Sequence, residues 1–197
     1  MKKESKEWIH SWCDDTNNRD LPRVLLIGDS ITYGYQAKVR ELLKGVCYVD
    51  YLATSYAVDM PIYNKLVETM AFDSDYDLVH FNHGLHGIHM SKRTYKSRLK
   101  KLLSKLERKM KIMVAKTTFV YQAGNKRKDA AWMKRVLERN EAMEELAAEK
   151  GYAVDDLYEV SVKMPVEKRY QDGTHYLEDG YEILAQTVAA KIKEIIK

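Results

Sequence analysis

The chain has 197 residues and a net charge of +4, with three prolines, nine glycines and no polar repeat that would indicate a linker. Two cysteines, Cys13 and Cys47, are too few for a disulfide framework and their spacing fits no metal site. The N-terminus lacks the apolar core of a signal peptide, and no segment reaches the roughly 20 apolar residues that span a bilayer. We therefore expect one domain, residues 1–197, that is cytoplasmic and does not bind membranes.

The first 20 residues are predicted to form an N-terminal helical extension. Its helix, at about residues 5–13, is expected to pack Trp8, Ile9 and Trp12 on the body of the protein. The rest of the chain alternates short β-rich apolar runs with longer helical patterns. Strands are predicted at residues 23–28, 46–52, 77–83, 111–117 and 152–155. Helices are predicted at residues 36–44, 59–70, 91–110, 129–150 and 179–196. This alternation predicts a parallel sheet between two layers of helices.

The predicted helix at residues 91–110 lies in a strongly basic stretch. Residues 91–111 contain ten Lys or Arg and one acid, Glu107, so a phosphate-binding or nucleic-acid-binding face is one interpretation. The same stretch has apolar residues at helical spacing, namely Leu99, Leu102, Leu103, Leu106 and Met110. A docked amphipathic helix with a solvated basic side explains both features. We therefore predict no nucleic-acid partner.

Polar residues follow every predicted strand, at residues 28–30, 54–56, 82–86, 117–118 and 155–156. In open α/β sheets, ligands bind beyond the carboxyl ends of the strands. Ser30 stands two residues after the first such strand in the run RVLLIGDS, which would hold its hydroxyl in a fixed place. The pattern predicts a site at this edge of the sheet, with Ser30 as a nucleophile.

A serine hydroxyl needs a base to become a nucleophile at neutral pH, and histidine is the usual one. His175 stands just before the last predicted helix, three residues after Asp172 in the segment DGTH. A loop there could bring Asp172 to one ring nitrogen and leave the other facing Ser30, as in a catalytic triad. The alternative is that this segment is a plain turn with His175 on the surface.

Four of the six histidines, at positions 80, 83, 86 and 89, lie in the segment HFNHGLHGIH. Spacing of three suits one face of a helix and suggests a metal site. However, the first part of the segment reads as a strand, in which His80 and His83 point to opposite faces. No cysteine or HExxH pattern accompanies it, so we predict that the protein binds no metal.

These motifs, in this order, resemble the SGNH or GDSL hydrolase family: GDS after the first strand, a glycine-containing block after the third, and DGTH before the last helix. The resemblance runs from about residue 23 to the C-terminus. It implies a flavodoxin-like, three-layer α/β/α sandwich with five parallel strands. It also implies Ser30 as nucleophile, Asp172 and His175 as the acid and base, and no cofactor.

The chain departs from that family at the third block, GxND, whose Asn binds the oxyanion. Here the block reads Gly84, Leu85, His86 and Gly87, so the sequence resembles a divergent branch in which His86 stands in the position of Asn. A neutral imidazole N–H can serve as an oxyanion donor. Asn82, nearby in sequence, is a second candidate.

The glycine of the second block is also missing, and Ser55, Tyr56 or Ala57 lies near its position. That glycine contributes a backbone N–H, which any residue except proline can supply. Tyr56 and Tyr121 also follow predicted strands, and their rings could contact a sugar or an acyl group. The complete set of candidates for oxyanion or substrate binding is Asp29, Tyr56, Asn82, Gly84, His86 and Tyr121.

The sequence thus favours a serine esterase that forms an acyl-enzyme and hydrolyses small carboxylic esters. The resemblance implies a short acyl group, such as acetyl on a carbohydrate, and leaves thioesters and lysophospholipids open. The two altered blocks motivate an alternative, a catalytically weakened module that binds a glycan or an acylated ligand. The sequence leaves the oligomeric state open.

Overall fold

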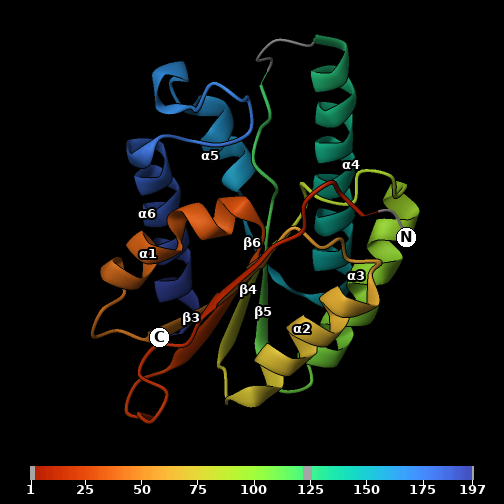
Figure 1. Cartoon of the computed structure of the whole chain (residues 1–197). Coiled ribbons are helices and arrows are strands. Elements are labelled where there is room, and N and C mark those ends of the chain that lie inside the picture. Colours follow the sequence, from red (N-terminus) through yellow and green to blue (C-terminus); the bar gives the residue numbers. More distant parts are fainter. Residues whose placement is uncertain (1–2, 122–125, 197) are drawn as a thin grey trace.

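The computed structural model describes residues 3–121 and 126–196. A six-stranded sheet lies between two layers of helices, with α1, α5 and α6 on one face and α2, α3 and α4 on the other (Figure 1). The strands are β1 (Ile9–Trp12), β2 (Arg23–Gly28), β3 (Tyr48–Thr54), β4 (Leu78–Asn82), β5 (Lys111–Ala115) and β6 (Ala153–Asp155). The helices are α1 (Ser30–Leu42), α2 (Pro61–Asp73), α3 (Lys92–Leu106), α4 (Lys126–Lys150), α5 (Leu157–Lys163) and α6 (Glu178–Ile195), with a short 3₁₀ turn, η1 (Val166–Lys168).

The strand order is β1-β3-β2-β4-β5-β6, and all neighbours from β3 to β6 pair in parallel. Without β1, this is the order of a flavodoxin-like sheet. The predicted three-layer α/β/α sandwich is confirmed, and each predicted parallel strand is found within a few residues of its expected place. The strand order reverses at β2, which lies between β3 and β4. The carboxyl end of β2 is therefore where the fold favours a ligand site.

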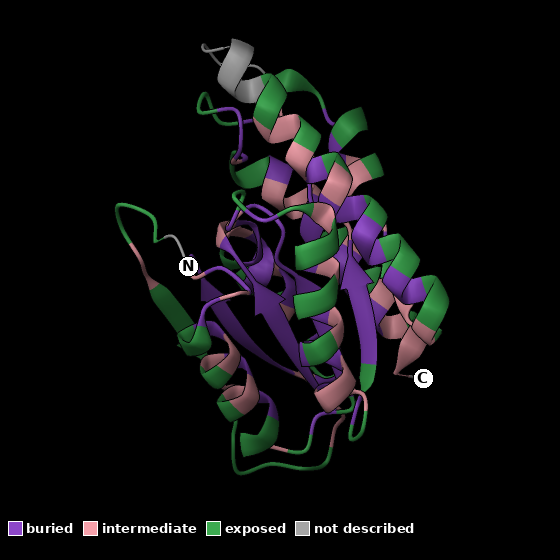
Figure 2. Ribbon diagram, turned by 90° about the vertical axis from the view of Figure 1, so that its right-hand side faces the viewer, coloured by how far each residue is buried: buried purple, intermediate pink, exposed green. Residues whose placement is uncertain are grey.

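The sequence of β2 explains why this strand is central. Its six residues, RVLLIG, are all buried. Leu25 and Ile27 pack in the core beneath α2 and α3, whereas Val24 and Leu26 pack in the core beneath α1 and α6. Successive side chains of a strand point to opposite faces, so a continuous apolar run fits a strand covered on both sides. Figure 2 shows the central strands buried, the edge strand β1 exposed, and the outer sides of the helices exposed.

The N-terminal extension is a strand, so the prediction of a helix at residues 5–13 was wrong. β1 pairs antiparallel with β3, with Ile9 opposite Thr54 and Trp12 opposite Tyr51, which makes six strands in place of the predicted five. The unpaired edge of β3 offers backbone groups that this segment satisfies. Ile9 is 41% exposed and Trp12 51% exposed, so Trp8 alone of the three predicted contacts packs against the core.

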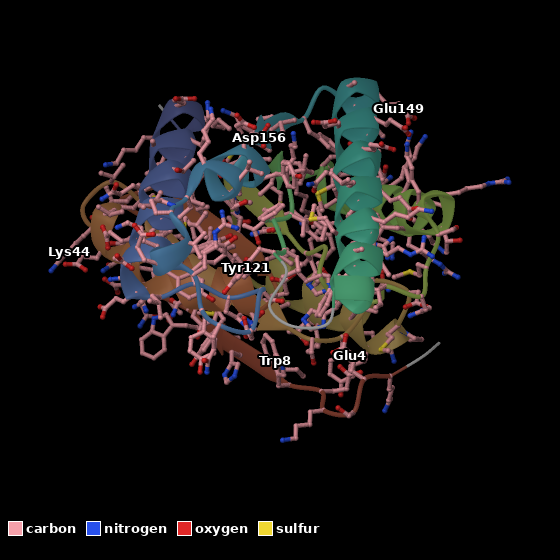
Figure 3. The ribbon with its side chains drawn as sticks, turned by 90° about the horizontal axis from the view of Figure 1, so that it is seen from above. Glu4, Trp8, Lys44, Tyr121, Glu149 and Asp156 are labelled. Atoms are coloured by element: carbon pink, nitrogen blue, oxygen red, sulfur yellow. The ribbon has the colours of Figure 1, made fainter. Side chains whose placement is uncertain are left out.

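The basic stretch forms α3 as expected, and its apolar residues Leu99, Leu102, Leu103 and Leu106 are buried. Its lysines face acidic residues of α4: Lys92 pairs with Glu141 and Glu145, Lys96 with Glu145, and Lys100 with Glu149. Figure 3 shows Glu149 on the outer side of α4. These three glutamates pair with three of the seven Lys and Arg residues of α3.

None of the helices in residues 3–121 and 126–196 combines the length and apolar character that a bilayer crossing requires.

Arg23 is a buried anchor at the opposite end of the sheet from the polar strand ends. Its side chain is 2% exposed, and Nη1 lies 2.9 Å from Oδ1 of Asp50, which is fully buried. The guanidinium also donates to the carbonyl oxygens of Asp14, at 2.6 Å, and Asp15, at 2.8 Å. Tyr76 donates to the second oxygen of Asp50 at 2.8 Å. One cation therefore ties the β1–β2 connection to β3.

Arg23→Gln is expected to lower the free energy of unfolding by about 3 to 5 kcal/mol, because it leaves the Asp50 carboxylate buried without its cation. Urea denaturation measures this loss. Arg93→Gln, an exposed position on α3, is the matched control and should change stability by less than about 0.5 kcal/mol. Equal stabilities for the two variants would contradict the role assigned to Arg23.

Candidate active site

Ser30 is the first residue of α1, and Asp29 alone separates it from the end of the central strand β2. Asp29 caps this helix: its Oδ1 accepts from the Ile31 amide at 3.0 Å, and its Oδ2 accepts from the Leu85 amide at 3.3 Å. The first N–H groups of a helix have no acceptor inside it, so the Ser30 amide can donate to a ligand. Asp29 itself is 1% exposed. This corrects the expectation that Asp29 contacts substrate, because it links two strand ends from beneath.

Two glycines allow these strand ends to approach closely. A Cβ on Gly28 would lie 1.9 Å from Oγ1 of Thr32 and 2.4 Å from the carbonyl oxygen of Asn82. A Cβ on Gly84 would lie 1.8 Å from Oγ1 of Thr117. Gly84, predicted to bind substrate, therefore has a packing role: it lets the segment after β4 lie against the segment after β5.

The structure brings Ser30, His175 and Asp172 together. Nε2 of His175 lies 2.8 Å from Oγ of Ser30, and Nδ1 lies 2.5 Å from Oδ2 of Asp172. The side chains of His175 and Asp172 are 38% and 39% exposed, so the group is open to solvent. Burial raises the pKa of Asp172, but hydrogen bonds from the His175 amide, the His175 ring and the Thr174 amide lower that pKa by more. The net shift is downward, and the carboxylate stays ionised beside the ring.

The loop that carries Asp172 is held by local hydrogen bonds. Oδ1 of Asp172 accepts from the amides of Thr174 and His175, each at 2.9 Å. Gly173, with φ of +80°, provides the left-handed turn between them. The Tyr121 amide donates to the Gly173 carbonyl at 2.9 Å, and the Tyr121 hydroxyl donates to the carbonyl of Tyr170. Tyr121, which Figure 3 shows near the middle of this face, thus supports the loop that carries Asp172 and His175.

Asn82 does not face the site, contrary to one of our two expectations for the oxyanion donor. Its side chain is buried, and Nδ2 donates to the hydroxyl of Tyr35 at 3.3 Å. The same hydroxyl lies 3.0 Å from Oγ1 of Thr32. Asn82 is the last residue of β4, and its side chain points toward α1. Its amide therefore belongs to an internal network under the first turn of that helix.

The backbone amides of the second block already have acceptors. The Tyr56 amide donates to Oγ1 of Thr54 at 3.2 Å, and the Ser55 amide donates to the Trp8 carbonyl at 3.3 Å. The half-buried Tyr56 side chain packs against the core under α2 and α3. A substrate oxygen would have to compete with Thr54 for the Tyr56 N–H.

His86 has one partnered and one unpartnered ring nitrogen. Nδ1 lies 2.8 Å from Oε1 of Glu4. Nε2 is shielded from solvent and has no hydrogen-bond partner among the described residues. The ring stacks on His83 at a centroid distance of 5.8 Å and meets the edge of Trp8 at 6.3 Å. Figure 3 shows Glu4 and Trp8 along the same side of the molecule.

The four histidines of the segment HFNHGLHGIH do not converge. His80 bonds to Asp155 in the core at 3.0 Å, and His89 bonds to Asp59 at 2.9 Å. Burial lowers the pKa of His83 to about 4. The described residues contain no group of three or more His, Cys, Asp or Glu side chains that could hold a metal ion.

No family model matches the chain, and no curated protein matches it. Solved structures do. A lipase/acylhydrolase from Enterococcus faecalis has a TM-score of 0.75 at 19% identity, over 90% of this chain and 98% of that one. A GDSL-like lipase from Bacteroides thetaiotaomicron has a TM-score of 0.70 at 14% identity, over 87% and 88%. An acetylxylan esterase from Geobacillus stearothermophilus has a TM-score of 0.68 at 17% identity, over 87% and 94%.

The chain has the SGNH hydrolase fold. The SGNH-like motifs seen in the sequence lie at the carboxyl ends of β2 and β4 and before α6, where the fold brings them to one edge of the sheet.

Sequence reasoning missed the contribution of the N-terminal segment to this SGNH fold. Oγ of Ser55 donates to Oε2 of Glu7 at 2.7 Å and accepts from the Trp8 amide at 2.8 Å. Oγ1 of Thr54 donates to the Trp8 carbonyl at 2.7 Å. These contacts join residues that are 46 to 48 positions apart in the sequence. No local sequence motif predicts them. Only the pairing of β1 with β3 places this segment beside the strand ends.

Proposed function

We propose that this protein is a serine esterase that hydrolyses small carboxylic esters through Ser30, His175 and Asp172. The observation that carries the proposal is the continuous row of two hydrogen bonds, 2.8 Å from Ser30 to His175 and 2.5 Å from His175 to Asp172. These distances lie within or at the short end of the range for a nucleophile, its base and the group that orients the base. The structural neighbours include an acylhydrolase and an acetylxylan esterase, which supports the same reaction class.

The chemistry proceeds as a double displacement. Nε2 of His175 takes the proton of Ser30 while its oxygen attacks the ester carbonyl carbon. Asp172 holds Nδ1–H and stabilises the imidazolium that forms. The imidazolium then gives its proton to the leaving alcohol, and an acyl-enzyme remains on Ser30. Water, activated by His175, attacks the acyl-enzyme and releases the acid. We propose that no cofactor takes part.

The tetrahedral oxyanion needs donors near Ser30. We assign the Ser30 amide and Nε2 of His86 to this role, with the Tyr56 amide as a third donor if substrate displaces Thr54. Removing one such donor typically costs about 10²- to 10³-fold in turnover. Asn82, whose amide is engaged with Tyr35, has no part in this assignment.

For the substrate, we propose a short acyl group on a carbohydrate or a related small molecule. Tyr33 lies one helical turn after Ser30 and is 45% exposed. Its ring stacks on His10 at 4.4 Å, and Trp8 lies beside His10 at 5.3 Å. Exposed aromatic faces with polar edges suit the alternating polar and apolar surface of a sugar ring. This cluster would contact the alcohol part of the ester, next to the reacting carbonyl.

Two features bear on the setting of the enzyme. Cys13 and Cys47 are free thiols, which fits a reducing compartment, and we propose a cytoplasmic location. The pairing of α3 lysines with α4 glutamates supports the proposal that neither nucleic acid nor membrane is a partner.

The test combines labelling with a substrate screen. A fluorophosphonate probe reacts with an activated serine and not with an inert one, so we expect one adduct, located on Ser30 by peptide mass spectrometry. The screen compares vinyl acetate, p-nitrophenyl acetate and peracetylated pyranosides, and we expect kcat/KM to be highest for the pyranosides. A folded protein that neither labels nor hydrolyses any ester would favour the second candidate, a glycan-binding module, which the occupied Ser55 and Tyr56 amides motivate.

A further inference from the structure

The contact between Glu4 and His86 joins the N-terminal segment to the proposed oxyanion site. The carboxylate is 2.8 Å from Nδ1, and the His86 side chain is 13% exposed against 46% for Glu4. The bond spans 82 positions of sequence. The residues that follow Glu4 are fixed in place, because Glu7 and Trp8 both form hydrogen bonds with Ser55. The N-terminal segment, fixed by these bonds, therefore places the Glu4 carboxylate against the His86 ring.

The direction of this hydrogen bond decides what Nε2 can do. The bond to His86 lowers the pKa of Glu4, so Glu4 is a carboxylate and can only accept. Nδ1 of His86 must therefore carry a proton. A neutral imidazole has one N–H, so with Nδ1 protonated its Nε2 is an acceptor and would repel an oxyanion. Only the doubly protonated ring offers an N–H on Nε2.

The charges around the ring favour that doubly protonated form. Burial lowers the pKa of His86, but the hydrogen bond to Glu4 and the negative charges of Asp29, Glu4 and Glu7 raise that pKa by more. The charge of Asp29 acts on the ring from the start of α1, and the charges of Glu4 and Glu7 act from the N-terminal segment. His83, the titratable group of the β4 end, is neutral because burial lowers its pKa to about 4.

The buried N–H on Nε2 calls for an acceptor. Nε2 has no partner among the described residues, and an unpaired, shielded charged donor is costly in a folded protein. A substrate oxygen that becomes negative in the transition state is an acceptor of the right charge. A charge-assisted donor is also about twice as strong as a neutral one.

We propose that Glu4 is a positioning residue of the oxyanion site, which holds His86 through Nδ1 as an imidazolium and so makes its Nε2–H the donor to the substrate oxyanion. The inference rests on the proposed esterase function. It means that the position filled by an uncharged amide in the GxND block is here filled by a cation, whose charge depends on a carboxylate from the N-terminal segment.

Kinetics give the first test, with vinyl acetate as substrate. The proposal needs a charged His86, so kcat/KM of the native chain should fall at alkaline pH as His86 loses its proton. Glu4→Gln should move the alkaline fall to lower pH and, at a pH just below the fall of the native enzyme, reduce kcat/KM by up to about 10²-fold, the cost of a lost donor. Glu41→Gln, which removes an exposed carboxylate from the far end of α1, is the matched control and should leave the profile unchanged.

His86→Asn separates the charge from the hydrogen bond. The amide donates at any pH, so this variant should keep measurable activity without the alkaline fall. In that background Glu4→Gln should have no further effect on kcat/KM. An alkaline fall that persists in His86→Asn, or a profile that Glu4→Gln leaves unmoved, would overturn the proposal.

A direct titration does not depend on turnover. The ring ¹⁵N shifts of His86, assigned by comparison with His86→Asn or by sequence-specific labelling, report its protonation in the native chain and in Glu4→Gln. We expect the ring to lose its proton at lower pH in the variant. Identical titrations would refute the role of Glu4 even in an active enzyme, whereas shifted titrations in a protein without esterase activity would refute only the function.

Discussion

Ser30→Ala is expected to lower the turnover number for p-nitrophenyl acetate by roughly 10⁴- to 10⁶-fold, the scale of loss when a triad serine is removed from a hydrolase. The methyl group cannot form the acyl-enzyme, and His175 would retain only a weak ability to activate water. The alanine should be accepted structurally, because Ser30 occupies the first turn of α1 and its hydroxyl bonds to His175 alone among the described residues.

The assay compares initial rates of purified native and variant protein across substrate concentrations. Ser97→Ala, an exposed serine of α3, is the matched control and should retain the full rate. Fluorophosphonate should label the native and control proteins and fail to label Ser30→Ala. Turnover by Ser30→Ala within tenfold of the native rate would remove Ser30 from the mechanism.

Asp172→Asn is expected to reduce kcat by about 10⁴-fold with little change in KM. The amide can turn its NH₂ group toward Nδ1 and stabilise the tautomer in which Nε2 holds the proton, so His175 can no longer accept one from Ser30. The asparagine Oδ1 can still accept from the Thr174 and His175 amides, as Asp172 does at 2.9 Å. The loop should therefore keep its shape.

Steady-state kinetics and thermal unfolding together test this interpretation. We expect the melting temperature of Asp172→Asn to change by only a few degrees, whereas kcat collapses. Asp75→Asn, an exposed position before β4, controls for the loss of one negative charge. A parallel loss of stability and activity in Asp172→Asn would mean that Asp172 maintains the loop and that its effect on His175 is secondary.

The layers of the fold could be predicted because β2 and its neighbours are buried on both faces. A continuous run such as Val24 to Ile27 has few alternatives to a central strand. The start of α1 was predicted six residues late, at residue 36. Gly34 interrupts the helical pattern there, and in the structure a Cβ at Gly34 would lie 2.1 Å from the ring of Tyr181. That glycine marks the close crossing of α1 and α6, which a local pattern cannot reveal.

The proposed triad could be predicted because its residues occupy motifs at the ends of elements, where a parallel sheet brings them to one edge. The hydrogen-bond donors proposed for the oxyanion could not be predicted in the same way. The direction of the Asn82 side chain depends on the pairing of β4, and the acceptor of the Ser55 amide depends on a strand that the sequence did not reveal. Glu4 is 82 positions from its partner, and a single carboxylate in a charged N-terminus carries no local signal.

The pairing of β1 with β3 has a practical consequence for anyone who shortens this protein. A chain beginning after residue 12 would expose a long row of unsatisfied backbone groups on β3, a template for self-association. The same cut would take away Glu4 and Trp8, which contact His86 at the proposed oxyanion site. One deletion that leaves Ser30, Asp172 and His175 in place would then cause both aggregation and a loss of substrate selectivity.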